Sequence, residues 1–281
     1  MPHELTTLLQ LRETIAHWRK GGARVALVPT MGALHRGHLT LVARAKEHAD
    51  KVVVSIFVNP TQFGPNEDFY RYPRPRARDL ALLHEAGADA AWLPEVATMY
   101  PEGFATNIHL AGITDLLDGA HRPGHFDGVA TVVAKLLLQV MPDIALFGEK
   151  DYQQLCVIRR LVADLNIAVE ILGVPTVREA DGLALSSRNQ YLSEAERARA
   201  PVLYAALMEV ATQLRHTPAP PAEPILRAAA EKLLAAGFAS IDYLALHAAD
   251  TLLPLAAHAP PARLLVAARL GATRLIDNIA C

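Results

Sequence analysis

The sequence Val25-Ala26-Leu27-Val28-Pro29-Thr30-Met31-Gly32-Ala33-Leu34-His35-Arg36-Gly37-His38 contains the features that decide the fold. Its first four residues are apolar and predict a buried strand that ends at Pro29, and Gly32 permits a tight turn. From His38 onward, apolar residues recur at helical spacing, so the turn leads into the N-terminus of a helix. Free backbone N–H groups and the positive end of the helix dipole favour a bound anion at such a terminus.

His35 and His38 flank Gly37 at this predicted terminus. Imidazoles there could donate to phosphate oxygens, and Gly37 leaves room for a flat or bulky group against the backbone. A metal-binding pair is an alternative, but neither a cysteine nor a third ligand stands nearby in the sequence. Most isolated His-x-Gly-His matches reflect chance or core packing, so the strand, turn and helix around this one favour a nucleotide site.

Composition excludes several classes of protein. The chain has 281 residues and a formal net charge of −2, which argues against broad nucleic-acid binding. Its apolar runs fall short of the roughly 20 residues that a membrane span needs, and its first residues do not resemble a secretory signal. Two cysteines, Cys156 in an apolar helical pattern and the last residue Cys281, do not form a disulfide framework. We expect a cytoplasmic enzyme without a membrane or nucleic-acid partner.

Strands alternate with helices through residues 1–175, which predicts a Rossmann-like, doubly wound parallel α/β domain. The expected helices cover residues 8–18, 38–48, 76–86, 129–140 and 151–165, and the expected strands cover 25–28, 52–58, 90–93, 144–147 and 168–174. Residues 176–281 are interpreted as a smaller α+β domain, serving as a lid. It should contain one long helix from Ser193 to Leu214, an irregular linker at 216–224, a helix at 225–236, and strands at 241–246, 263–268 and 273–276.

Three further motifs carry polar groups at expected strand ends or loops. Asn59 and Gln62 follow the second strand, where ligands bind in open α/β sheets, although Asn-Pro and Gly-Pro also mark ordinary turns. Lys150 lies beside an expected helix N-terminus, from which it could reach phosphate oxygens, and Gln154 should face the cleft one turn later. The third motif, Ser186-Ser187-Arg188, can bind triphosphate oxygens, because a guanidinium matches two oxygens at once.

Another segment, residues 68–76, mixes aromatic residues with arginines. It could be a flap that attracts phosphate, but a solvated loop is the more general explanation of such a pattern.

The pattern Pro-Thr-Met-Gly-x-Leu-His-x-Gly-His at residues 29–38 resembles the HIGH signature of adenylate-forming nucleotidyltransferases. With the three later motifs in order, the chain resembles the pantothenate synthetase (pantoate–β-alanine ligase) family. The resemblance assigns ATP binding to Met31, Gly32, Ala33, Leu34, His35, Arg36, Gly37, His38, Gly148, Glu149, Lys150, Asp151, Val177, Leu185, Ser186, Ser187 and Arg188. It assigns pantoate to Gln62 and Gln154, associates Gln62 also with β-alanine, and matches Tyr72 and Arg122 to further cleft positions. Asn59, placed by its position at the strand end, is a further candidate for binding these substrates. Thr61 and Leu185 stand where many members carry Met, and neither position needs a reactive group.

The family resemblance implies an ATP-dependent ligase that uses Mg²⁺ and is a cytoplasmic homodimer. Pantoate would attack the α-phosphorus of ATP, and β-alanine would displace AMP from the resulting pantoyl-adenylate. We assign His38, His35, Lys150, Ser187 and Arg188 to stabilising phosphate charge, with no resident protein metal site. Two alternatives remain: an adenylyltransferase that keeps AMP in its product, and a non-catalytic nucleotide sensor. We also expect Arg188 to lack a partner until ATP supplies one, which would let the lid close over the cleft.

Overall fold

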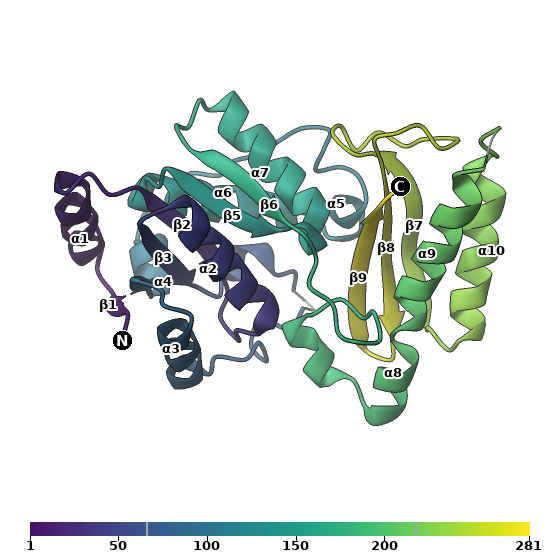
Figure 1. Cartoon of the computed structure of the whole chain (residues 1–281), viewed down its shortest axis with the longest axis horizontal. Coiled ribbons are helices and arrows are strands. Elements are labelled where there is room, and N and C mark those ends of the chain that lie inside the picture. The colour runs from purple at the N-terminus through teal and green to yellow at the C-terminus, as the bar shows by residue number, and fades with distance from the viewer. Residues whose placement is uncertain (66, 217) are drawn as a thin grey trace.

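The computed structural model describes residues 1–65, 67–216 and 218–281. A parallel sheet of six strands in the order β1-β4-β3-β2-β5-β6 forms the centre of the N-terminal part (Figure 1). Its strands are β1 (His3–Leu5), β2 (Val25–Thr30), β3 (Lys51–Ile56), β4 (Ala90–Trp92), β5 (Ile144–Gly148) and β6 (Glu170–Val174). This arrangement confirms the predicted Rossmann-like sheet and adds the short edge strand β1.

Helices cover both faces of this sheet, which explains the nearly continuous apolar strands. Alternate residues of β2 point to opposite faces: Val25 and Leu27 join one core cluster, and Ala26 and Val28 join another. The first cluster includes α1 (Leu8–Lys20), α6 (His125–Val140) and α7 (Tyr152–Asp164). The second includes α2 (Arg36–His48) and α3 (Arg76–Glu85). Short helical turns complete this part at α4 (Val96–Met99), α5 (Asp118–His121), η1 (Pro60–Gln62) and η2 (Glu149–Asp151).

The strand order reverses at β2, which pairs with β3 on one side and β5 on the other. Ligands in such sheets bind beyond the carboxyl ends of the strands at this reversal. His35 and His38 lie at the N-terminus of α2, just after β2, and Lys150 lies in η2, directly after β5. The topology therefore brings the His35–His38 motif and the Lys150 motif to the same edge of the sheet.

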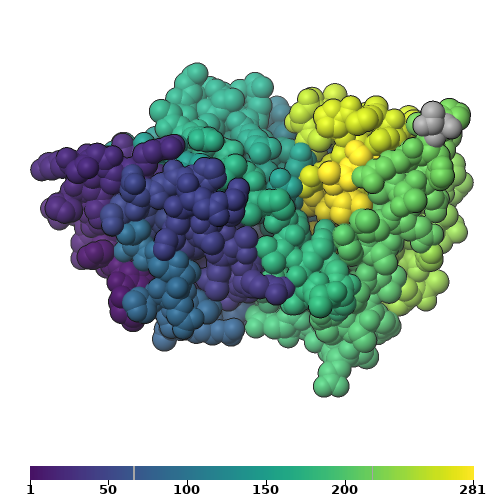
Figure 2. Space-filling model, viewed as in Figure 1, coloured from purple at the N-terminus to yellow at the C-terminus, as the bar shows by residue number. Residues whose placement is uncertain are grey.

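The C-terminal part contains an antiparallel sheet of β7 (Ser240–Ala248), β8 (Ala262–Leu270) and β9 (Thr273–Ala280). Helices α9 (Val202–Leu214) and α10 (Ala222–Ala235) pack on one face of it, around Leu207, Leu233 and Val266. Leu265, on the opposite face of β8, joins the core cluster of α6 and α7 instead. The small sheet thus lies between its own helices and the N-terminal part, and the final residues reach the surface at this junction (Figure 2).

Two expectations for the C-terminal part were wrong. The helix predicted from Ser193 to Leu214 is two helices, α8 (Glu194–Arg199) and α9, which meet at Pro201. Proline has no N–H and its ring clashes with the carbonyl four residues earlier, so it cannot continue a helix. Helix α10 starts at Ala222, inside the predicted linker, because the first turn of a helix tolerates Pro224. Thr217 of that linker lies outside the described residues.

Among the described helices, none is long and apolar enough to cross a membrane.

Candidate active site

His35 and His38 organise the N-terminus of α2. His35 is the N-cap, and its Nδ1 accepts the N–H of Gly37 at 3.1 Å. The Nδ1 of His38 accepts the N–H of His35 at 3.3 Å, and the ring centroids lie 4.1 Å apart. Because both Nδ1 atoms accept, each neutral imidazole carries its proton on Nε2. Both rings line a cavity of about 240 Å³, into which they can offer donors.

Both imidazoles remain uncharged at neutral pH. Burial lowers the pKa of His35 to about 4, and the positive charge of Lys150 acts in the same direction. Burial, His35 and Lys150 lower the pKa of His38 to about 3. The pair can therefore offer oriented N–H dipoles but no positive charge, and Lys150 is the nearby cation.

Asp79 of α3 holds the turn between β2 and α2. Its carboxylate accepts the N–H of Ala33 at 2.9 Å and that of Leu34 at 2.8 Å, and it is buried. Gly32 and Ala33 both have positive φ, 80° and 51°, which costs free energy at the alanine. The two hydrogen bonds offset this cost, so Asp79 positions the turn that carries the histidines. Sequence reasoning missed Asp79, because nothing local links residue 79 to this turn.

The turn that carries Lys150 is held by the last strand. The Nδ2 of Asn278 in β9 donates to the carbonyls of Glu149 and Lys150 at 2.9 and 2.8 Å. Arg263 of β8 in turn donates to Asn278 Oδ1 at 2.7 Å and to Glu149 Oε2 at 2.8 Å. The C-terminal sheet therefore fixes a turn of the N-terminal part. No pattern around Asn278 predicted this contact.

Asn59 and Gln62 lie in one polar cluster at η1. Asn59 Nδ2 donates to Gln62 Oε1 and to the Gly128 carbonyl, and Asn59 Oδ1 accepts from Tyr100 at 2.7 Å. Helix α6 approaches η1 so closely that a Cβ on Gly128 would lie 2.4 Å from the carbonyl oxygen of Thr61. Asn59 is buried, and its amide is engaged within the protein, where it holds the side chain of Gln62.

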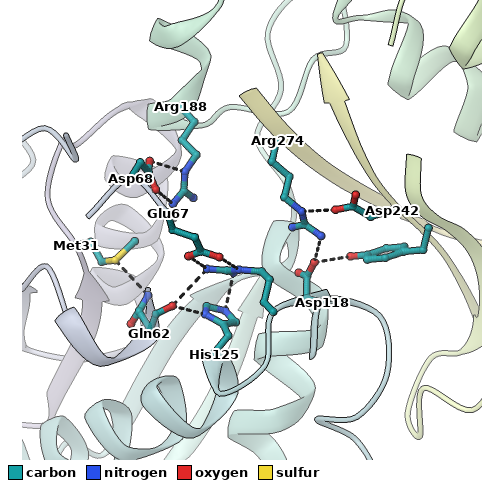
Figure 3. A network of polar contacts seen from close by, with 11 residues as sticks. Met31, Gln62, Glu67, Asp68, Asp118, His125, Arg188, Asp242 and Arg274 are labelled. Carbon is teal, nitrogen blue, oxygen red and sulfur yellow. Dashed lines mark hydrogen bonds and ion pairs between the residues drawn. The ribbon is translucent and has the colours of Figure 1, made fainter. Parts of the chain in front are cut away.

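Two neighbouring carboxylates, Glu67 and Asp68, form ion pairs with two arginines that line the cavity (Figure 3). Arg122 donates through Nε and Nη2 to Glu67, both at 2.7 Å. Arg188 donates through Nε and Nη2 to Asp68 at 2.9 and 2.8 Å. The expectation that Arg188 lacks a partner was therefore wrong: Asp68, from the segment interpreted as a solvated loop, provides it.

Most of the predicted site residues line the same cavity. They are Met31, His35, Gly37, His38, Asn59, Gln62, Tyr72, Arg122, Gly148, Lys150, Asp151, Gln154, Val177, Leu185, Ser186, Ser187 and Arg188. The structure places Gly32, Ala33, Leu34, Arg36 and Glu149 outside that lining. Leu34 is buried in the core, Arg36 points to the Arg178 carbonyl, and Glu149 binds Arg263. Any contact of these residues with a ligand remains a prediction.

A second cavity of about 370 Å³ continues toward the antiparallel sheet. It shares Arg122, His125, Lys150, Asp151, Gln154, Ser186 and Arg188 with the first. The two spaces therefore form one cleft, closed on one side by η3 (Ser187–Tyr191). Tyr72 contacts Ser187 across it, with their hydroxyl oxygens 3.1 Å apart.

Comparison with known proteins identifies the family. A family model described as pantoate-beta-alanine ligase matches residues 3–280. The chain belongs to the pantoate–β-alanine ligase family. The pantothenate synthetase of Paramagnetospirillum magneticum is 57% identical over 277 residues, which cover 99% of this chain and 97% of that protein. The protein is accordingly an enzyme, a pantoate–β-alanine ligase.

Solved structures of other members of this ligase family have the same fold. The pantothenate synthetase of Thermus thermophilus superimposes with a TM-score of 0.91 and 53% identity, with 99% of each chain covered. The pantoate-beta-alanine ligase of Francisella tularensis, crystallised with beta-gamma ATP and beta-alanine, gives a TM-score of 0.85 and 34% identity. That comparison covers 100% of this chain and 98% of the Francisella chain.

Proposed function

We propose that this ligase activates (R)-pantoate with ATP as pantoyl-adenylate, and that β-alanine then displaces AMP to form pantothenate. The observation that carries the proposal is one cavity lined by the His35–His38 pair, Lys150 and the Ser187–Arg188 segment. The Francisella relative, whose structure is a complex with beta-gamma ATP and beta-alanine, supports ATP and β-alanine as substrates here.

The chemistry requires an activated carboxylate. A carboxylate is a poor electrophile at neutral pH, so the amine of β-alanine needs a better leaving group than oxide. Attack of a pantoate carboxylate oxygen on the α-phosphorus expels pyrophosphate and leaves AMP bound to the acyl carbon. Attack by the amine then expels AMP, which keeps the pantoate oxygen.

The protein groups can stabilise the charge of both steps without forming a covalent bond. The Nε2–H groups of His35 and His38 are directed donors, while Lys150 and Arg188 supply positive charge. Fixed donors of this kind need little reorganisation during the reaction and are among the strongest contributors to catalysis. Gln62 and Gln154 line the same cavity, where their amides can orient the pantoate hydroxyl and carboxylate.

We propose that Mg²⁺ arrives with ATP as part of the substrate. Mg²⁺ often takes one or two carboxylates and completes its shell with phosphates and water. Within residues 1–65, 67–216 and 218–281, no three His, Cys, Asp or Glu side chains form a metal-binding group. Asp151 lines the cavity beside Lys150 and is the carboxylate best placed to approach such an ion. The proposal also includes a homodimer in the cytoplasm, as the family resemblance implies.

Isotope transfer tests the mechanism. Pantoate labelled with heavy oxygen in its carboxylate is mixed with ATP and Mg²⁺, and β-alanine is added afterwards. We expect one equivalent of pyrophosphate before the amine is added, and labelled AMP after it. Label in inorganic phosphate alone would indicate an acyl-phosphate route. Retention of AMP in the final product would instead indicate an adenylyltransferase.

A further inference from the structure

Glu67 and Asp68 are adjacent carboxylates that occupy two different arginines of the cleft. Each forms a bidentate ion pair through Nε and Nη2, with all four distances between 2.7 and 2.9 Å. Bidentate pairing of this kind is stronger and more directional than a single contact. Figure 3 shows the side chains of Glu67 and Asp68 directed toward the arginines that they contact.

Both pairs are sheltered from solvent. The side chains of Asp68 and Arg122 are 13% and 16% exposed, and those of Glu67 and Arg188 are 27% and 30% exposed. Burial opposes ionisation, yet Arg122 and Arg188 hold the pKa values of Glu67 and Asp68 below their usual range. Both carboxylates are therefore anionic at neutral pH.

The occupied edges of the two guanidinium groups are those that a substrate anion would use. A carboxylate or a phosphate binds a guanidinium most favourably through two parallel N–H donors. In Arg122 the remaining Nη1 lies 2.9 Å from His125 Nε2, so the edge facing Glu67 is the one suited to a ligand. His125 donates from Nδ1 to the Gln62 carbonyl at 2.8 Å, which orients its Nε2 as an acceptor toward Arg122.

We propose that Glu67 and Asp68 are specificity-determining residues that act as internal anions, which the anionic substrates must displace. This inference rests on the proposed function. The triphosphate of ATP replaces Asp68 as the partner of Arg188, and the carboxylate of pantoate replaces Glu67 as the partner of Arg122. A tethered carboxylate has a high effective concentration at its arginine, so a lone anion gains little by replacing it. ATP also reaches His35, His38, Lys150 and Ser187, and these extra contacts let it displace Asp68.

Titration calorimetry on the full chain separates the two pairs. We expect Asp68→Asn to bind ATP about fivefold more tightly, the factor equivalent to an ion pair of about 1 kcal/mol. Its affinity for adenosine and for pantoate should not change. Glu67→Gln, which removes the same charge one residue away, should bind pantoate about fivefold more tightly and leave ATP unchanged. The double variant Asp68→Asn with Arg188→Ala should not show the tighter ATP binding expected of Asp68→Asn alone.

Three results would overturn the proposal. Weaker ATP binding in Asp68→Asn would show that Asp68 supports the ligand, through Arg188 or a metal ion. Equal tightening of ATP in both variants would reduce the effect to net charge. Unchanged affinities in both variants would mean that the ion pairs do not compete with substrates. Asp68→Ala serves as a second variant if Asp68→Asn does not fold. Calorimetry measures binding and does not depend on catalysis. If the wild-type protein bound neither ATP nor pantoate, the proposed function would be refuted rather than the role of the two ion pairs.

Discussion

At the residue scale, the imidazoles of His35 and His38 are donors whose direction is set by the backbone. Each Nδ1 accepts a backbone N–H, which leaves each Nε2–H free to face the cavity. Burial and Lys150 keep both rings neutral. At neutral pH each imidazole can therefore donate a hydrogen bond to a phosphate oxygen while the ring stays uncharged.

Replacing His38 should slow adenylate formation far more than it affects folding. His38→Ala removes one oriented donor, and the loss of such a donor typically costs about a hundredfold in rate. We expect that decrease in single-turnover pyrophosphate release with ATP and pantoate. His84→Ala, on the exposed face of α3, is the matched control. Near-normal release by a stably folded His38→Ala would show that His38 has a structural role only.

The lowered histidine pKa values predict how stability depends on pH. His35, His38 and His125 have pKa values of about 4, 3 and 4 in the folded protein, below the usual 6.5. Between these values and 6.5 the unfolded chain binds more protons, so the free energy of unfolding falls as the pH decreases. Urea unfolding between pH 7 and pH 5 should show this decrease. Histidine resonances of residues 35 and 38 that titrate near pH 6.5 would contradict it.

At the scale of elements, the turn between β2 and α2 depends on a neighbouring helix. Asp79 of α3 binds two consecutive N–H groups of this turn, where Ala33 has a positive φ. The geometry of the histidines therefore depends on how α3 packs against β2 and α2, around Leu80 and Leu83.

Asp79→Asn should disturb this turn without leaving a cavity, because the two side chains are nearly the same size. The amide oxygen can accept one N–H, but the NH₂ group then faces the other donor, which is left unsatisfied at a cost of about 1–3 kcal/mol. We expect a lower free energy of unfolding in urea and about tenfold slower pyrophosphate release, the cost of a small misplacement of His35 and His38. Asp164→Asn, at the exposed end of α7, should change neither. If Asp79→Asn lost stability but kept the full rate, Asp79 would not position the site.

At the scale of the whole molecule, polar contacts join the antiparallel sheet to the N-terminal part. Arg274 of β9 donates to Asp118 of α5 at 2.6 Å and to Asp242 of β7 at 2.7 Å. The hydroxyl of Tyr243 donates to the same Asp118 at 3.1 Å (Figure 3). We propose that residues 176–281 form a lid domain, and these contacts set how firmly its sheet is attached.

Arg274→Gln should weaken this attachment. It leaves Asp118 and Asp242, which are 12% and 16% exposed, without their shared cation. Removing one partner of a buried ion pair typically costs about 3–5 kcal/mol, and solvent access reduces the expected loss here to about 2 kcal/mol. Urea unfolding would measure it, and hydrogen exchange should increase in residues 118–121 and 240–248. Arg227→Gln, on the α10 surface, is the control. Unchanged exchange in both segments would show that the network does not hold the sheet.

The sequence by itself determined the elements and the chemistry of their ends. Apolar runs of period two or 3.6 predicted most strands and helices, and the turn with His35 and His38 was recognisable, because these patterns depend on neighbouring residues. The break at Pro201 was also a local signal, although the regular pattern around it led to one helix being predicted. The family resemblance placed Lys150, Gln154 and Arg188 at the same site, where they line one cavity.

The tertiary structure alone decided which residues hold that site in place. Asp79 reaches a turn 45 residues away, and Asn278 reaches the Lys150 carbonyl across 128 residues. Asp68 pairs with Arg188 across 120 residues, where the sequence had indicated an unpaired cation. Such contacts depend on the packing of distant elements and leave no periodic pattern, since one carboxylate or amide on a loop looks the same whether solvent or an arginine faces it.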